Sequence, residues 1–167
     1  MHSKTQKIVI SALMAALACV ATMVIKIPSP LKGYMNLGDC IVLVAGWTLS
    51  PGYGFLAAGL GSTLADLFLG YAIYAPATFV IKGSMALIAF ICFNLMNKRI
   101  GTFFARLIGG ASAEIFMVIG YFVFEGCMYG FAPSAVNIPV NAAQGVAGLI
   151  IGIVLIKVFD KANIMSQ

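Results

Sequence analysis

Charged side chains are scarce in this sequence. Asp, Glu, Lys and Arg together make up 9% of the 167 residues, whereas hydrophobic residues make up 62%. A water-soluble domain carries about 25% charged residues, because its surface has to be solvated. The mean hydropathy of +1.04 agrees with the low charge. The composition therefore excludes a soluble globule and predicts that much of the protein surface faces lipid.

The net charge of +5 does not indicate a nucleic-acid partner. The basic residues form no stripe interleaved with aromatic side chains, which a nucleic-acid-binding surface would require. They lie mostly at the ends of apolar runs, as membrane topology demands. We therefore expect a lipid bilayer, and no nucleic acid, as the surroundings of this chain.

Phosphate-binding loops and paired cysteines are also lacking, and there is only one histidine. The single histidine is His2, so the sequence offers no Ser–His nucleophile pair and no imidazole metal site. No G-x-x-x-x-G-K-[ST] loop is present, which excludes ATP hydrolysis by that route. The cysteines show no C-x-x-C spacing and are typical of small packing residues. These absences argue against an enzyme and predict neither a metal nor a cofactor. The four cysteines are Cys19, Cys40, Cys92 and Cys127.

Long apolar runs are what the sequence does contain. A helix needs about 20 apolar residues to cross a bilayer, and five runs approach this length, while a sixth is shorter. The alternating pattern of a membrane barrel is missing. The first run is followed by further apolar runs, so we expect a retained span and not a secretory signal. The sequence predicts an all-α integral membrane protein, one domain over 1–167, built as a single bundle of six transmembrane helices. The runs cover 8–27, 37–50, 53–72, 76–96, 104–126 and 138–157.

The positions of lysine and arginine predict the orientation of the bundle. Six spans place both termini on one side of the membrane. If that side is the cytoplasm, only Lys26 and Lys32 face outward, and Lys82 lies within a span. Such an excess of basic residues in the cytoplasmic segments is the positive-inside pattern, so we expect cytoplasmic termini. The inward-facing residues are Lys4, Lys7, Lys98, Arg99, Arg106, Lys157 and Lys161.

Ionisable residues inside the apolar runs are few. Such residues are costly in a membrane and usually face the bundle interior, where they pair or bind something. Asp66 and Lys82 fall on successive antiparallel spans, roughly 7–9 Å below the outer rim at 1.5 Å per residue. Two interpretations stay open: they form a structural ion pair, or they belong to a binding site. Glu114 lies nearer the cytoplasmic end and is expected to be structural or to face a partner. The full set is Asp39, Asp66, Lys82, Glu114 and Glu125.

Polar side chains also share faces on the last two spans. Tyr121 and Glu125 fall on the face that carries Glu114, and Asn137, Asn141 and Gln144 form an outer stripe on the sixth span. The amides either bond to neighbouring helices or line a pocket, and three on one stripe favour a pocket. Tyrosines near this layer suit a small, flat, polar ring compound, although interfacial tyrosines also serve as membrane anchors. They are Tyr34, Tyr71, Tyr74, Tyr121 and Tyr129.

The first span carries small residues at helical spacing in "SALMAALACVA". Ser11, Ala15 and Cys19 fall at i, i+4 and i+8, and Ala12 and Ala16 repeat the spacing one step on. Such a face lets another helix approach closely. The partner helix belongs either to another protein or to the same bundle.

The whole chain resembles a known family. The run "YMNLGDCIVLVAGWTLSPGYGFLAAGLGSTLADLFLGY", the following "PATFVIKG" and the alanine-spaced "SALMAALACVA" are similar to the substrate-capture (S) components of energy-coupling-factor (ECF) vitamin transporters of bacteria. The likeness is to the branch with carriers of riboflavin-like, hydroxymethylpyrimidine-like and pyridoxine-like substrates. It implies a multi-pass protein of the cytoplasmic membrane. It also implies that a transmembrane coupling protein and two ATPase subunits drive uptake.

The resemblance also implies roles for particular residues. The substrate is expected to be a small pyridine or pyrimidine ring, with riboflavin possible. Asp39 and Asp66 are each expected either to take part in an ion pair or to lie behind the ligand-contacting groups. The substrate-binding residues implied are Asn36, Lys82, Tyr121, Glu125, Asn137, Asn141 and Gln144, and the docking face for the coupling protein comprises Ser11, Ala12, Ala15, Ala16 and Cys19.

Two alternatives remain at this point. The first is a membrane scaffold or assembly protein without a transport role, whose buried charges serve only helix packing. The second is an intramembrane enzyme, which would turn over a substrate on its own.

Overall fold

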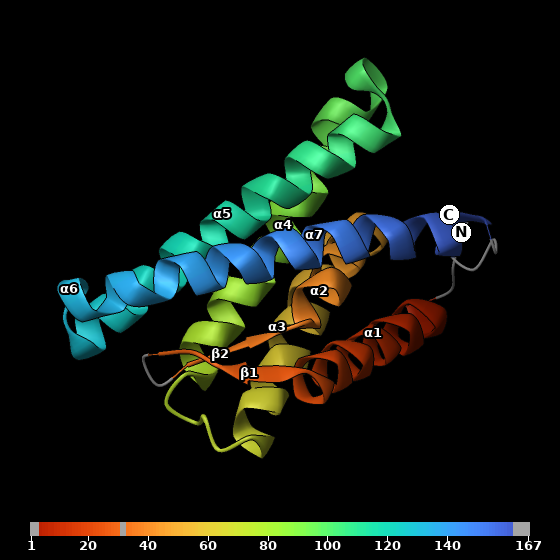
Figure 1. Ribbon diagram of the computed structural model, residues 1–167. Coiled ribbons are helices and arrows are strands. Elements are labelled where there is room, and N and C mark those ends of the chain that lie inside the picture. The colour runs from red at the N-terminus through yellow and green to blue at the C-terminus, as the bar shows by residue number, and fades with distance from the viewer. Residues whose placement is uncertain (1–3, 31–32, 162–167) are drawn as a thin grey trace.

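The computed structural model describes residues 4–30 and 33–161, so His2 and Lys32 lie outside the described residues. Helices dominate it, joined at one point by a short β-hairpin (Figure 1). All six apolar runs form helices, with bounds that differ by a few residues from those expected. The elements are α1 (Lys4–Val24), β1 (Lys26–Pro28), β2 (Tyr34–Asn36), α2 (Gly38–Thr48), α3 (Pro51–Phe68), α4 (Ala75–Ile100), α5 (Thr102–Tyr129), α6 (Phe131–Ser134), a 3-10 turn η1 (Ala135–Asn137) and α7 (Ile138–Lys161).

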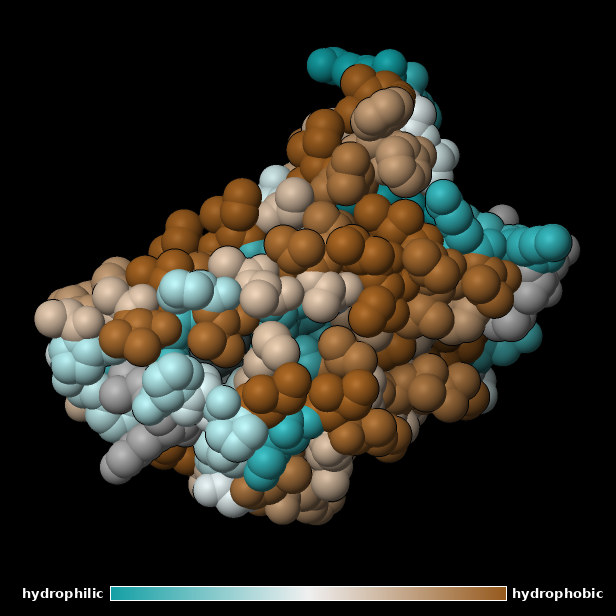
Figure 2. All heavy atoms as spheres, viewed as in Figure 1, coloured by the Kyte–Doolittle hydropathy of each residue, from teal (hydrophilic) through white to brown (hydrophobic). Residues whose placement is uncertain are grey.

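Four helical segments are long and apolar enough to cross a membrane. They carry large hydrophobic side chains on the outside, among them Leu13, Leu95 and Ile115. Figure 2 shows this surface as a brown hydrophobic belt with teal, hydrophilic patches beyond it. The belt is the surface expected for a multi-pass membrane protein, because lipid replaces water around it. The four segments are Lys4–Val24, Ala75–Ile100, Thr102–Tyr129 and Phe131–Lys161.

The short helix α2 lies in the middle of the bundle. It packs against α1, α3, α4 and α7, and ten of its eleven residues are buried, Gly38 to Trp47. A helix enclosed by other helices need not match the thickness of the bilayer, because its ends and sides meet protein. This position explains why the second run is too short for a lipid-exposed span.

Gly46 allows α2 and α4 to pack closely against each other. A Cβ atom built on Gly46 would lie 2.5 Å from the carbonyl oxygen of Ala86 and 3.0 Å from its Cα. We expect Gly46→Ala to destabilise the protein by about 1–3 kcal/mol, because backbone on a packed helix cannot move aside cheaply. Gly52→Ala is the matched control, since nothing lies within 4 Å of its Cβ position. Thermal unfolding in detergent measures both, and equal melting temperatures would contradict this packing.

The β-hairpin covers one end of the bundle. Its strands are antiparallel, with Lys26 opposite Asn36 and Pro28 opposite Tyr34. The apolar runs predicted only a connection here, between 8–27 and 37–50. Figure 1 shows the hairpin at the end where α6 and the α3–α4 connection also lie, with the start of α1 and the end of α7 at the opposite end.

The end of the bundle opposite the hairpin carries paired basic residues. Arg106 Nη1 lies 2.6 Å from Asp160 Oδ2, which joins α5 to the end of α7. Lys157 Nζ lies 5.1 Å from the centroid of the Phe103 ring. The two ends of the bundle therefore differ in chemistry, since the hairpin end carries the buried polar groups described next.

Candidate functional site

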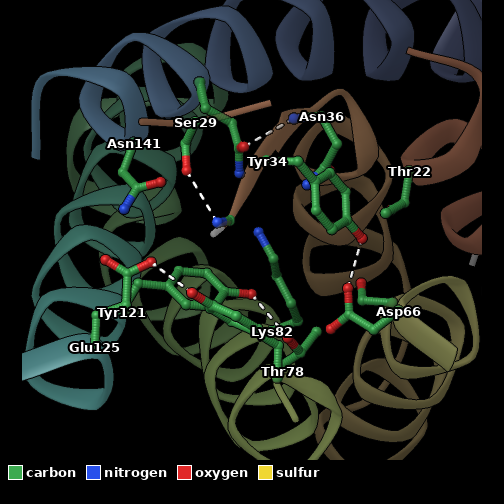
Figure 3. A pocket seen from close by; sticks show the side chains of 14 residues that line it. Thr22, Ser29, Tyr34, Asn36, Asp66, Thr78, Lys82, Tyr121, Glu125 and Asn141 are labelled. Atoms are coloured by element: carbon green, nitrogen blue, oxygen red, sulfur yellow. Dashed lines mark hydrogen bonds between the residues drawn. The ribbon is translucent and has the colours of Figure 1, made fainter. Parts of the chain in front are cut away.

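A polar cavity lies beneath the hairpin, among α1, α3, α4, α5 and α7 (Figure 3). Its volume of about 30 Å³ is room for two or three water molecules. Nine residues singled out from the sequence line it: Tyr34, Asn36, Asp66, Tyr74, Lys82, Tyr121, Glu125, Asn141 and Gln144. The polar residues expected near one end of the bundle therefore come together in a single site.

A chain of hydrogen bonds and an ion pair crosses the site. Lys82 Nζ on α4 pairs with Asp39 Oδ1 at the start of α2. Gln144 Nε2 on α7 donates to the other oxygen, Asp39 Oδ2, at 2.6 Å. Gln144 Oε1 in turn accepts from the backbone N–H of Asn36 in the hairpin, at 2.9 Å. This chain links the hairpin to three helices, and Asp39 itself lies fully buried behind the cavity wall.

The partner of Lys82 is thus Asp39; of the two interpretations left open for Asp66 and Lys82, the ion pair between them is not formed. The reason is depth. Asp66 is two residues from the end of α3 at Phe68, whereas Lys82 is seven residues into α4 from Ala75, so they lie about 3 Å and about 10 Å inside their helices. Asp39, in the first turn of the central helix, lies at the depth that Lys82 reaches.

Asp66 instead joins α3 to the hairpin. Tyr34 Oη donates to Asp66 Oδ1 at 2.5 Å. Burial and the Asp66 carboxylate raise the pKa of the Tyr34 phenol, so Tyr34 remains a protonated donor at neutral pH. The Thr78 hydroxyl is within reach of Asp66 and lies 3.1 Å from Tyr121 Oη.

Glu125 on α5 is held by two neighbours. Asn137 Nδ2 donates to Glu125 Oε1 and Oε2 at 2.9 and 3.0 Å, and Tyr74 Oη donates to Oε1 at 3.3 Å. Asn137 is not among the cavity-lining residues. Asn137 therefore lies behind Glu125 and orients it, whereas Asn141 lines the cavity.

Several lining residues were missed in the sequence. Thr78 precedes Lys82, and Ser62 precedes Asp66, by four residues, which places each pair on one helix face. That spacing was the signal that could have found them. For the residues of the hairpin no comparable periodic signal exists. The missed residues are Thr22, Ser29, Gly33, Ser62 and Thr78.

The positions of Glu114 and of the small residues on α1 bear on the predictions of partner contact. Glu114 is buried against Gly145 and Gly148 of α7, so it packs internally and does not face a partner. Ser11 and Cys19 are also buried, which corrects their assignment to a docking face. Ala12 and Ala16 are exposed.

Ala15 belongs with the internal packing as well. It is only partly exposed, and a Cβ atom on Gly61 of α3 would lie 2.3 Å from its carbonyl oxygen. The Ser11, Ala15 and Cys19 stripe is therefore turned toward the bundle, where α1 packs against α3.

The arrangement defines a class of protein. A multi-pass helical bundle encloses a polar cavity at one end, beneath a hairpin, with side chains suited to hydrogen bonding a small molecule. Within residues 4–30 and 33–161, no group of three or more His, Cys, Asp or Glu side chains could hold a metal ion. These features describe a membrane-embedded binding subunit.

The chain belongs to the family of ECF-type riboflavin transporter S components, whose model matches residues 2–161. It is a substrate-binding S component of an ECF transporter for the uptake of a vitamin or vitamin precursor. As such it is a multi-pass protein of the plasma membrane and a transport subunit, not an enzyme. Membership also implies an ECF module as partner.

Two curated relatives are similar along most of the chain. A protein of Pyrococcus woesei described as an uncharacterized protein in gap 3'region is 34% identical over 134 residues, 80% of this chain and 87% of the relative. The thiamine precursor transporter HmpT of Lactococcus lactis subsp. cremoris is 24% identical over 140 residues, 84% of this chain and 78% of HmpT.

Solved structures share the fold. The S component of a bacterial ECF transporter superposes with a TM-score of 0.76 at 23% identity, covering 99% of this chain and 100% of that one. The S component for biotin from an ECF-type ABC transporter superposes with a TM-score of 0.63 at 20% identity, covering 94% and 95%. The helical architecture of this chain is thus that of the solved S components.

Proposed function

We propose that this protein captures a small ring-shaped vitamin or precursor from outside the cell, with a pyridoxine-like or hydroxymethylpyrimidine-like compound favoured over riboflavin. The observation that carries this proposal is the buried polar cavity beneath the hairpin, lined by carboxylate, amide, hydroxyl and phenol groups from five helices. The name of the relative HmpT, a thiamine precursor transporter, supports the same preference, while the family model is named for riboflavin.

The hairpin must move for any such ring to enter. A single ring needs more room than two or three water molecules, and the hairpin is tied over the cavity by Tyr34 to Asp66 and by Asn36 to Gln144. Both ties are hydrogen bonds that a ligand could replace. The binding residues proposed are Asn36, Lys82, Tyr121, Glu125, Asn141 and Gln144. Asp66 also lines the cavity, and Asp39 and Asn137 lie behind the lining residues.

The orientation and partners complete the proposal. The chain acts as one domain with cytoplasmic termini, because that orientation keeps most basic residues inside and turns the hairpin outward. A transmembrane coupling protein and two ATPase subunits then supply the energy for inward release, since the chain has no phosphate-binding loop of its own.

A binding experiment tests this function. Protein purified in detergent is expected to carry a small molecule that mass spectrometry identifies, and to bind one member of a panel of water-soluble vitamins and precursors with a dissociation constant in the nanomolar range. Isothermal titration calorimetry measures the affinity after the co-purified compound is removed. A protein that carries no such molecule and binds nothing in the panel would favour the scaffold alternative, in which the buried charges serve helix packing only.

A further inference from the structure

Two buried hydroxyl groups on the α1–α3 side of the cavity make no hydrogen bond. Thr22 on α1 and Ser62 on α3 are 3% and 1% exposed, and both line the cavity. Within the part of the chain that the structure describes, neither Thr22 Oγ1 nor Ser62 Oγ has a hydrogen-bond partner. Buried hydroxyls without partners are uncommon, because leaving one unpaired costs free energy.

Other helical hydroxyls in this protein do find partners. Those of Ser11, Thr48 and Ser112 each donate to the carbonyl oxygen four residues earlier, at 2.7, 2.7 and 2.9 Å. This bond within the helix is the usual solution for serine and threonine. Thr22 and Ser62 forgo it, so their hydroxyls remain able to bond to a molecule in the cavity.

Asp66 lies beside these hydroxyls. It stands one helical turn after Ser62 on α3, on the same face, and is 4% exposed. Tyr34 occupies one of its oxygens, but a carboxylate has about four acceptor positions, so Asp66 can accept further. Figure 3 shows Thr22 and Asp66 on one side of Lys82, with Asn141 and Glu125 on the other.

The charges of the site restrict what can lie between these sides. The ammonium of Lys82 is paired with Asp39. Asp66 and Glu125 then face the cavity as carboxylates from opposite sides, and the described lining residues contain no cation besides Lys82. Two carboxylates attract hydrogen-bond donors and repel an anion such as a phosphate ester.

We propose that Thr22, Ser62 and Asp66 form a ligand-binding wall that holds a hydrogen-bond-donating edge of the ligand, such as a hydroxyl, hydroxymethyl or amino substituent. The ligand class is accordingly an unphosphorylated ring with donors on two sides, one for this wall and one for Glu125. This inference rests on the proposed function and adds to it the helices α1 and α3. It also gives the site a preference for the free compound over its phosphate ester.

Substitutions that keep the shape but remove the hydroxyls test the wall. Thr22→Val and Ser62→Ala are each expected to weaken binding about three- to tenfold, the effect of losing one neutral hydrogen bond. The melting temperature without ligand is expected to stay the same or rise, because an unpaired buried hydroxyl is removed. Calorimetry with riboflavin, pyridoxine and 4-amino-5-hydroxymethyl-2-methylpyrimidine as probes gives the affinity.

Matched controls separate a ligand role from a general effect. Thr48→Val and Ser112→Ala remove hydroxyls that are bonded within their own helices and that do not line the cavity, so affinity is expected to stay unchanged. Asp66→Asn retains an oxygen that accepts from Tyr34, but its amide NH₂ group is a donor and cannot accept a hydrogen bond from the ligand. It is therefore expected to weaken binding by about tenfold or more.

The outcomes distinguish this inference from the proposed function. If the wild-type protein binds a probe and Thr22→Val with Ser62→Ala binds it as tightly, the wall is wrong and the function stands. If a phosphate ester binds more tightly than its free parent compound, the assigned ligand class is wrong. If the wild-type protein binds none of the probes or any other water-soluble vitamin, the proposed function fails and the inference fails with it.

Discussion

Replacing Lys82 by methionine is expected to destabilise the protein by about 3–5 kcal/mol and to lower ligand affinity at least tenfold. The stability loss follows from the ion pair: without the ammonium group, the fully buried carboxylate of Asp39 loses its counter-charge, and an isolated buried charge costs this much. The affinity loss follows from position, because Lys82 lines the cavity and lies 5.5 Å from the centroid of the Tyr121 ring.

A second substitution separates these two effects. In Lys82→Met with Asp39→Asn, the charge at position 39 is removed together with that of its partner, and Gln144 can still donate to the amide oxygen at position 39. Most of the lost stability is therefore expected to return, whereas the affinity is not. Thermal unfolding in detergent and calorimetry measure the two quantities on the same preparations.

A control and two contrary outcomes complete this test. Lys157→Met removes a lysine at the other end of the bundle, over the Phe103 ring, and is expected to leave both quantities nearly unchanged. A double variant that binds as tightly as wild type would make Lys82 purely structural. A Lys82→Met variant as stable as wild type would refute the ion pair itself.

The helices could be predicted from the sequence because each apolar run is long enough for several helical turns. The hairpin could not, since strands of three residues, Lys26–Pro28 and Tyr34–Asn36, are too short to show an alternating pattern. The central position of α2 was also beyond the sequence, because a short apolar run fits a buried helix and a tilted span equally well. Only packing against four neighbours decides between them.

Site residues that share the face of one helix could be predicted from the sequence, whereas contacts between two helices could not. Tyr121 and Glu125, and likewise Asn141 and Gln144, share faces set by helical periodicity alone. The pairing of Lys82 depends on where α3 ends and α4 begins. Six non-helical residues, 69–74, lie between the two helices. Because of them α3 ends four residues, or more than one helical turn, before the predicted end at residue 72. The unpaired hydroxyls had no signal, because most helical serines and threonines bond to their own backbone.

A second experiment with a large expected effect uses substitutions on the first helix, which should block transport without affecting substrate binding. Ala12 and Ala16 are exposed on α1, and helices in membranes associate closely where such small residues let their backbones approach. We propose that the coupling protein docks there. Ala12→Trp with Ala16→Trp is then expected to reduce uptake to about a tenth of wild type or less, because two indole rings hold the partner helix away.

Substrate binding is expected to survive in the same variant. On α1 the cavity contact is Thr22, which lies about 9 Å along the helix axis from Ala16, and both alanines point away from the core. Uptake is measured in cells that also express an ECF module, and binding by calorimetry on purified protein. Co-purification of the coupling protein and the ATPase subunits reports docking directly.

Leu13→Trp provides the matched control. Leu13 is 59% exposed on the same helix, but it is already large, so a tryptophan there adds little bulk to a close helix contact, and uptake is expected to stay near that of wild type. Loss of uptake and binding together in the alanine variant would mean that these positions serve the fold of α1. Full uptake with the two tryptophans in place would move the docking site to another helix. Loss of uptake and of co-purification, with binding intact, is the result that the exposed alanine face requires.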